Sequence, residues 1–186
     1  MLIKVNNITL RPFRNSDSEL LAQWRADKEI RFLTMMHPYT VSESLTNRWL
    51  DQVMHDTSNK NVYFAIEEND SETFIGYFTL QKIDVVNRNA MAGIVIADKN
   101  CRGKGLGKEI MQTGMEYGFN FLGLKKISVQ VVEGNTSAIK LYKNLGFETE
   151  GTLINQYFFD GIWHNVLLMA KFASDESFAP HKGTKH

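Results

Sequence analysis

The stretch NCRGKGLGKEI, residues 100–110, places three glycines at alternate positions directly before a helical pattern. Glycine has no Cβ atom, so the backbone N–H groups of such a loop can point at an anion. The N-terminus of the following helix adds unpaired N–H donors and the positive end of a dipole. The pattern therefore predicts a loop that binds a pyrophosphate group.

Two well-known phosphate-binding loops do not fit this stretch. A Walker loop needs Ser or Thr after its lysine, whereas Glu109 follows Lys108, and Gly103 stands one residue too close to Gly107. Dinucleotide-binding loops have the spacing Gly-x-Gly-x-x-Gly, whereas Gly103, Gly105 and Gly107 give Gly-x-Gly-x-Gly. We therefore expect a phosphate loop of a third kind.

Composition and charge limit the classes of protein to consider. The chain has 186 residues, of which 43% are hydrophobic, and this is the size of one compact domain with a good core. Its 21 basic and 21 acidic residues cancel, so no overall field attracts nucleic acid or an anionic membrane. A single cysteine, Cys101, excludes an internal disulfide and every cysteine-cluster metal site. With no signal peptide and no apolar run of ~20 residues, we expect a soluble, cytoplasmic protein without nucleic-acid, membrane or metal partners.

The alternation of apolar and polar residues predicts a mixed α+β fold with a central, largely antiparallel sheet. Strands are expected over 2–13 (as one strand or a hairpin), 61–68, 73–84, 89–97, 125–132, 148–159 and 162–172, the last two joined at Asp160-Gly161. Helices are expected after the capping residues 15–17, over 40–54, after the glycine loop with Leu106, Ile110, Tyr117 and Phe121 on one face, and from Asn135 to Gly146. Residues 1–172 are expected to form one domain, and residues 173–186 a loose tail.

Two motifs at this separation resemble those of the GNAT family of N-acetyltransferases. The family's loop reads Arg or Gln, two residues, Gly, one residue, Gly or Ala, and Arg102, Gly105 and Gly107 match it. Its later motif, Asn-x-x-Ala-x-x-x-Tyr-x-x-x-Gly-Phe, is matched by Asn135, Ala138, Tyr142, Gly146 and Phe147. The resemblance covers residues 8–172, and segments 115–135 and 146–165 look most like the branch of spermidine, ribosomal-protein and amino-sugar N-acetyltransferases.

This resemblance implies an acetyl-CoA-dependent N-acetyltransferase whose twisted sheet splays between the fourth and fifth strands. It implies that the loop backbone binds the pyrophosphate, that the preceding strand pairs with pantetheine, and that Tyr142 protonates the departing CoA thiolate. The implied cofactor-binding residues are Val95, Ile96, Ala97, Arg102, Gly103, Lys104, Gly105, Leu106, Gly107, Lys108, Asn135, Ala138 and Tyr142. From composition alone, Tyr142 would be a core aromatic on an apolar helix stripe, and Asn135 a helix cap.

The residue that deprotonates the acceptor amine is not evident. Many members of this branch carry a Glu early in the strand before the glycine loop, but residues 90–92 read Ala-Met-Ala. Glu67, Asp84 and His164 are candidates by position, although each also reads as an ordinary surface residue. Cys101 is not expected to act as a nucleophile, because direct transfer needs no covalent step and no histidine is placed to activate it.

The resemblance also implies an acceptor groove between the first two helices and the final hairpin. Its expected aromatic walls are Trp24, Trp49, His37, Tyr39, Phe159 and Trp163. A polyamine would favour several carboxylates, but Asp27, Glu29 and Glu43 are interspersed with Arg25, Lys28 and Arg31. A polyamine, an amino-sugar and a protein N-terminus are therefore open as acceptors, as is self-association into a homo-oligomer. The alternative function is a catalytically silent acyl-CoA-binding module, which would have no use for the Tyr142 phenol.

Overall fold

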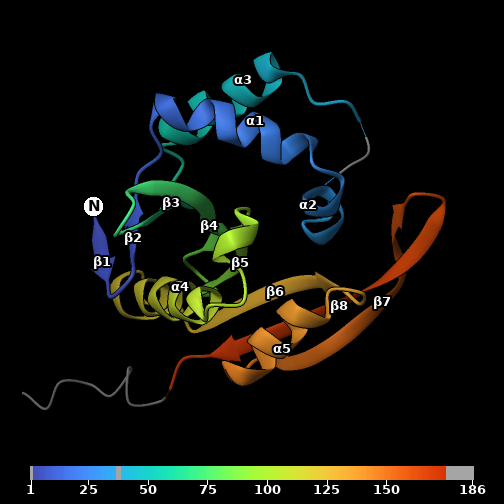
Figure 1. The fold of residues 1–186 in the computed structure, drawn as a ribbon. Coiled ribbons are helices and arrows are strands. Elements are labelled where there is room, and N and C mark those ends of the chain that lie inside the picture. Colours follow the sequence, from blue (N-terminus) through green and yellow to red (C-terminus); the bar gives the residue numbers. More distant parts are fainter. Residues whose placement is uncertain (1, 37–38, 175–186) are drawn as a thin grey trace, which may run out of the picture.

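The computed structural model of the chain describes residues 2–36 and 39–174. Eight strands form one sheet in the order β1-β2-β3-β4-β5-β6-β8-β7 (Figure 1). The mixed α+β class with a mostly antiparallel sheet is therefore confirmed. Of the expected tail, residues 175–186 lie outside the described residues, and so does His37 of the expected acceptor groove.

The first five strands form an antiparallel half of the sheet. They are β1 (Ile3–Val5), β2 (Ile8–Arg11), β3 (Val62–Glu68), β4 (Thr73–Asp84) and β5 (Asn89–Ile96). The segment 2–13 is thus a hairpin, with its turn at Asn6-Asn7, rather than one strand. All four residues of β2 are buried: strands flank both its edges, and Ile8 and Leu10 pack in the core cluster that includes α4.

The sheet splits after β5. β6 (Lys126–Val132) runs parallel to β5 and pairs with it only at Asn89–Met91, although both strands continue further. Beyond β6 lie β8 (Ile162–Phe172) and, at the edge, β7 (Glu148–Phe159). The expected splay between the fourth and fifth strands therefore lies between β5 and β6, because the N-terminal hairpin adds a strand to the count.

Helices cover both faces of the antiparallel half (Figure 1). On one face lie α1 (Ser18–Ala26) and α3 (Glu43–Met54), which pack with Ala65 of β3. On the other face lie α4 (Leu106–Glu116) and a π-helical turn, η3 (Tyr117–Phe121), which pack with Phe64 and Ile66. This division follows from the alternation of side chains along a strand. α5 (Thr136–Asn144) joins the same core cluster as α4.

The first predicted helix is divided into three short elements. A 3₁₀ turn, η1 (Asn15–Asp17), leads into α1, and α2 (Lys28–Leu33) follows after a break. The break is at Asp27, whose backbone is extended and whose side chain accepts a hydrogen bond from the N–H of Ile30. Asp27 therefore ends one helix and caps the next, which turns α2 toward the end of β5.

Among the described residues, no helix is long and apolar enough to cross a membrane.

Candidate functional site

The glycine loop adopts a left-handed backbone at two positions. A short 3₁₀ turn, η2 (Lys99–Cys101), precedes it, and φ is +76° at Gly103 and +83° at Gly105. Side chains rarely adopt these angles, which explains why glycine stands at both positions. A Cβ atom built on either glycine would meet no atom within 4 Å, so the space in front of both is open.

The loop presents a run of N–H groups that the chain itself does not use. At its two ends, the N–H of Arg102 donates to the Lys99 carbonyl (3.3 Å) and the N–H of Lys108 donates to the Gly105 carbonyl (3.0 Å). Between them, the N–H groups of residues 103–107 have no backbone or side-chain acceptor within the described part of the chain. They lie at the N-terminus of α4, where the helix dipole favours an anion.

Gly107 has a second, structural reason to be glycine. A Cβ atom there would lie 3.3 Å from Leu141 Cδ2 of α5 and 3.6 Å from Ile96 Cδ1 of β5. The absence of that atom lets α5 approach the N-terminus of α4. The two helices that carry the expected cofactor motifs therefore meet beside the glycine loop.

The last residues of β5 point their backbones in alternate directions. The N–H of Ala97 donates to the Ile75 carbonyl (2.9 Å), so the backbones of Ala97 and Val95 face β4. Alternation then directs the backbone of Ile96 toward the split with β6, where strand pairing has already ended. Ile94 shares this orientation, and sequence reasoning missed it because the pairing direction cannot be read from the sequence.

Tyr142 is buried in the main core cluster, 5% exposed, with its ring centroid 5.5 Å from that of Phe147. Burial raises the pKa of its phenol to about 12, so it is a neutral donor at physiological pH. The hydroxyl has no hydrogen-bond partner among the described residues. It is also not fully enclosed, because the fully enclosed side-chain atoms without a partner among those residues are Arg25 Nε and Thr46 Oγ1. Its proton is thus available to an incoming ligand.

Asn135 occupies the N-cap of α5, as its sequence position predicts. Its Oδ1 accepts a hydrogen bond from the N–H of Ala138 (3.1 Å). Two residues of the later motif, Asn135 and Ala138, thus form the hydrogen bond that caps the helix carrying Tyr142.

The three candidate bases have different surroundings. Glu67 accepts hydrogen bonds from Arg11 (2.5 Å) and Arg14 (3.2 Å). Asp84 is held in the β4–β5 turn by the N–H groups of Val86 and Asn87, and Asn87, through its backbone and its side chain, is the main cause that lowers the pKa of Asp84. The lowered pKa makes Asp84 a weak proton acceptor.

His164 alone of these candidates lies near the expected acceptor side. It is on β8, with its ring 5.0 Å from that of Phe32 in α2. The structure thus brings His164 beside α2, on the expected acceptor side, whereas Glu67 and Asp84 belong to an ion-pair network and a turn.

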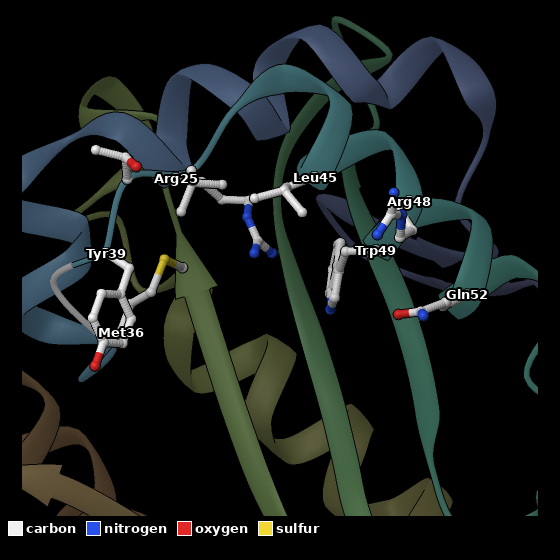
Figure 2. A pocket seen from close by; sticks show the side chains of 9 residues that line it. Arg25, Met36, Tyr39, Leu45, Arg48, Trp49 and Gln52 are labelled. Carbon is white, nitrogen blue, oxygen red and sulfur yellow. The ribbon is translucent and has the colours of Figure 1, made fainter.

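The predicted aromatic walls do not meet in one place. Trp24 packs on Phe74, with ring centroids 4.7 Å apart, and Phe159 packs on Phe32 at 5.3 Å. Trp163 is 58% exposed at the tip of the final hairpin. Tyr39 and Trp49 line a separate pocket of about 280 Å³ between α1, α3 and the segment 39–41 (Figure 2).

Two of the three carboxylates of the expected acceptor groove have other partners. Asp27 caps α2, and Glu29 accepts from Arg102 Nη1 (2.7 Å) and Lys99 Nζ (3.0 Å). Glu43 lies exposed in the first turn of α3. The link between α2 and the glycine loop through Glu29 was not predicted, because it joins residues 73 positions apart.

Comparison with known proteins agrees with these features. Residues 7–148 match the family model described as an acetyltransferase (GNAT) domain. The chain is 29% identical to the spermidine N(1)-acetyltransferase of Escherichia coli K12 over 95% of this chain and 91% of that protein. It is 32% identical to the N-acetyltransferase p20 of Bacillus licheniformis over 78% and 82% of the two chains.

Solved structures show the same similarity. Spermidine N-acetyltransferase of Vibrio cholerae, in complex with CoA and spermine, superposes with a TM-score of 0.83 and 26% identity over 93% of this chain and 99% of that one. The chain therefore belongs to the GNAT acetyltransferase family and is an acetyl-CoA-dependent N-acetyltransferase.

Proposed function

We propose that this protein transfers the acetyl group of acetyl-CoA directly to a primary amine, with the cofactor held by the glycine loop and the open edge of β5. The observation that carries the assignment is the run of N–H groups at residues 103–107. None of them donates a hydrogen bond to an acceptor among the described residues. A pyrophosphate placed there would accept from several of these groups and lie at the positive end of α4.

The pantetheine arm would then run along the split in the sheet. Ile94 and Ile96 turn their backbones toward this split. Because the Ile96 carbonyl already accepts from Arg102 Nε, amides of the arm can pair with the backbone of Ile94 and the N–H of Ile96 as an added strand would. The acetyl thioester would lie near the end of β5, close to α5, and an N–H there can polarise its carbonyl.

Tyr142 would supply the proton that the leaving CoA thiolate takes up. The amine attacks the thioester carbonyl, the C–S bond breaks, and the phenol proton moves to the sulfur. The amine loses its own proton to a base or a water relay, and His164 is the candidate that lies nearest to the acceptor side. Val95, Ala97, Asn135 and Ala138 would shape the site mainly through packing and capping.

The acceptor is a primary amine, and the relatives favour a polyamine. The Escherichia coli and Vibrio cholerae relatives are named for spermidine, and the Vibrio structure holds spermine. Against a polyamine, two of the three groove carboxylates, Asp27 and Glu29, are engaged within the protein. An acceptor that also bears a carboxylate is the second candidate, because Arg25 and Arg48 line one pocket beside α1 and α3.

We also propose that residues 1–172 act as one cytoplasmic domain that self-associates. The single cysteine fits a reducing compartment. One Vibrio relative has been described as a dodecamer. On this chain, Ile154, Ile162 and Trp163 expose apolar side chains on the final hairpin, where a second copy could pack.

The test is a panel of amines with acetyl-CoA, followed by the release of free thiol. The panel contains spermidine, glucosamine, a peptide with a free N-terminus, and phenylalanine. We expect thiol release that depends on the amine. Tight binding of acetyl-CoA without release for any amine would support the silent binding module instead.

A further inference from the structure

The pocket between α1 and α3 contains an arginine that has no counter-ion among the described residues. Arg25, in the last turn of α1, lies over the indole of Trp49, with its guanidinium carbon 5.0 Å from the ring centroid. Its Nε is fully enclosed and has no hydrogen-bond partner, and no carboxylate of the described residues lies in ion-pair range of it. Figure 2 shows Arg25 and Trp49 projecting from their helices toward the same space above the strands.

Arg11 shows how this chain treats a buried arginine that serves only the fold. It donates to both oxygens of Asp17 (2.8 and 2.9 Å) and to Glu67 (2.5 Å). Although burial alone would lower its pKa, the hydrogen bonds to Asp17 and Glu67 raise it. At Arg25, burial lowers the pKa and only a tyrosine, Tyr77, opposes the shift. The charge of Arg25 is thus partly desolvated, and the Trp49 ring and Tyr77 compensate it less than the two carboxylates compensate Arg11, which is a cost to the folded state.

The walls of the pocket indicate what kind of anion would compensate this charge. Arg48 adds a second cation without an ion pair among the described residues. The remaining walls are largely apolar or aromatic: Met36, Tyr39, Val41, Leu45 and Trp49, with Thr40 and Gln52 as the uncharged polar residues. A volume of about 280 Å³ is at the small end of ligand pockets, and none of the described residues that line it is acidic. This combination suits a small organic acid with an apolar body.

The pocket is one layer of side chains away from the end of β5. Tyr77 of β4 pairs with Val95 of β5 and packs with Trp49, with ring centroids 6.1 Å apart. Val95 and Ala97 in turn pack with Trp24 and Tyr77. A ligand seated on Arg25 would therefore press on the side chains that support the end of β5.

We propose that this pocket binds a small organic carboxylate, whose charge is received by Arg25 and Arg48 and whose apolar body packs against Trp49 and Tyr39. The carboxylate belongs either to the acceptor amine itself or to a separate effector. A polyamine does not fit, because its ammonium groups would meet two arginines.

The first experiment compares benzoate with its uncharged isostere benzamide on the protein without cofactor. Binding is followed by calorimetry and tryptophan fluorescence, since Trp49 lines the pocket. We expect saturable binding of benzoate and at least about tenfold weaker binding of benzamide, a difference of about 1.4 kcal/mol. Equal binding of the two, or equal binding of benzoate and inorganic phosphate, would overturn the proposal.

Variants then locate the binding. Arg25→Gln should lose benzoate binding, Arg25→Lys should keep part of it, and Arg14→Gln, which removes an equal charge from an exposed ion pair, should keep all of it. Without ligand, we expect Arg25→Gln to melt no lower than the wild type, because it removes a desolvated charge. Full benzoate binding by folded Arg25→Gln would contradict the assignment.

A third experiment identifies the source of the carboxylate, and this arm alone rests on the proposed acetyl transfer. Phenylalanine and phenylalaninamide are compared as acceptors. A lower KM for phenylalanine that disappears in Arg25→Gln assigns the carboxylate to the acceptor. Equal KM values, with benzoate still bound, assign it to an effector. Failure of every amine would affect the proposed acceptor reaction only, because the benzoate titration measures no turnover.

Discussion

Glu29 of α2 binds Arg102 of the glycine loop, with 2.7 Å between Oε1 and Nη1. The same guanidinium donates through Nε to the carbonyl of Ile96 (2.9 Å). One arginine thus connects α2, the end of β5 and the loop proposed to hold the pyrophosphate. A substitution of Glu29 should therefore alter the contacts of Arg102 in the loop, although the two residues are far apart in the sequence.

Removal of this carboxylate should have a small effect on stability that depends on pH. Hydrogen bonds from Lys99 and then Arg102 lower the pKa of Glu29. A lowered folded-state pKa means that the contribution is present above the ordinary pKa of a glutamate and is lost as the pH falls through the lowered value. Because Glu29 is about half exposed, we expect Glu29→Gln to lose about 1 kcal/mol or less at pH 7.

Urea unfolding of both proteins between pH 7 and pH 3 measures this difference. We expect the two curves to converge at the acid end. Asp160→Asn, which removes the exposed ion pair with Lys28, is the matched control for the loss of one surface carboxylate. Because Asp160 does not contact the glycine loop, this variant should also leave the affinity for acetyl-CoA unchanged. A Glu29→Gln protein that differs equally from wild type at every pH would argue against the ion pair.

Acetyl-CoA should raise the melting temperature, whereas ATP and NAD should do little. A ligand that binds only the folded state stabilises it by RT ln(1 + [L]/Kd), about 2.7 kcal/mol at a hundredfold excess over Kd. The pantetheine arm distinguishes acetyl-CoA from the other two, because it alone can pair with the open edge of β5. Thermal unfolding with each compound is the measurement, and equal shifts from ATP and acetyl-CoA would indicate a generic phosphate loop.

Substitutions at Gly105 should separate backbone strain from obstruction of the anion site. Gly105→Val places a β-branched side chain at φ +83° and in front of the loop N–H groups. We expect weaker acetyl-CoA binding by at least about tenfold, together with a loss of about 1–2 kcal/mol of stability. Gly105→Asn should keep most of the stability, because Asn tolerates this backbone, but still weaken binding. Equilibrium binding and urea unfolding are measured on the same samples, and an unchanged Kd in both variants would remove the loop from the site.

Tyr142→Phe should lower turnover without affecting the fold. The hydroxyl has no partner among the described residues, so its loss leaves no group unsatisfied within them. If the phenol protonates the CoA thiolate, kcat should fall by roughly 10²- to 10⁴-fold, with acetyl-CoA affinity and Tm nearly unchanged. A fall of only about tenfold would mean that the hydroxyl mainly positions the sulfur. Full activity would sink the general-acid role.

The pH profile gives an independent check on the same residue. With a pKa of about 12, the phenol stays protonated throughout the range in which the enzyme is assayed. Deprotonation of Tyr142 should therefore cause no fall in kcat between pH 7 and pH 10 in the wild type. An alkaline fall in kcat within that range that is absent in Tyr142→Phe would contradict the burial of the phenol.

Much of the local structure follows from signals of short range. Asp160 and Gly161 both have positive φ, as their hairpin turn requires, and Asn135 caps α5 as its position predicts. These features depend on neighbours within a few residues, and sequence carries that information directly.

The differences arise where the outcome depends on more distant contacts. Asp27 breaks a helix that was predicted as continuous, because its side chain can cap the next turn as readily as continue the last. Phe121 stacks on Tyr117, with which it was predicted to share a helix face, but it lies in a π-helical turn and is 70% exposed. In the site, the open edge at Ile94 and the missing counter-ion of Arg25 depend on strand pairing and helix packing.

The three residue pairs between β5 and β6 also have a mechanical meaning. Beyond Met91, β5 and β6 are no longer paired, so a cofactor lying in the split would connect the two halves of the sheet. Loading the enzyme should then slow amide exchange along residues 92–96 and damp the motion of the β6–β8 half relative to the β1–β5 half. While it is bound, acetyl-CoA would thus take the place of a ninth strand in the sheet.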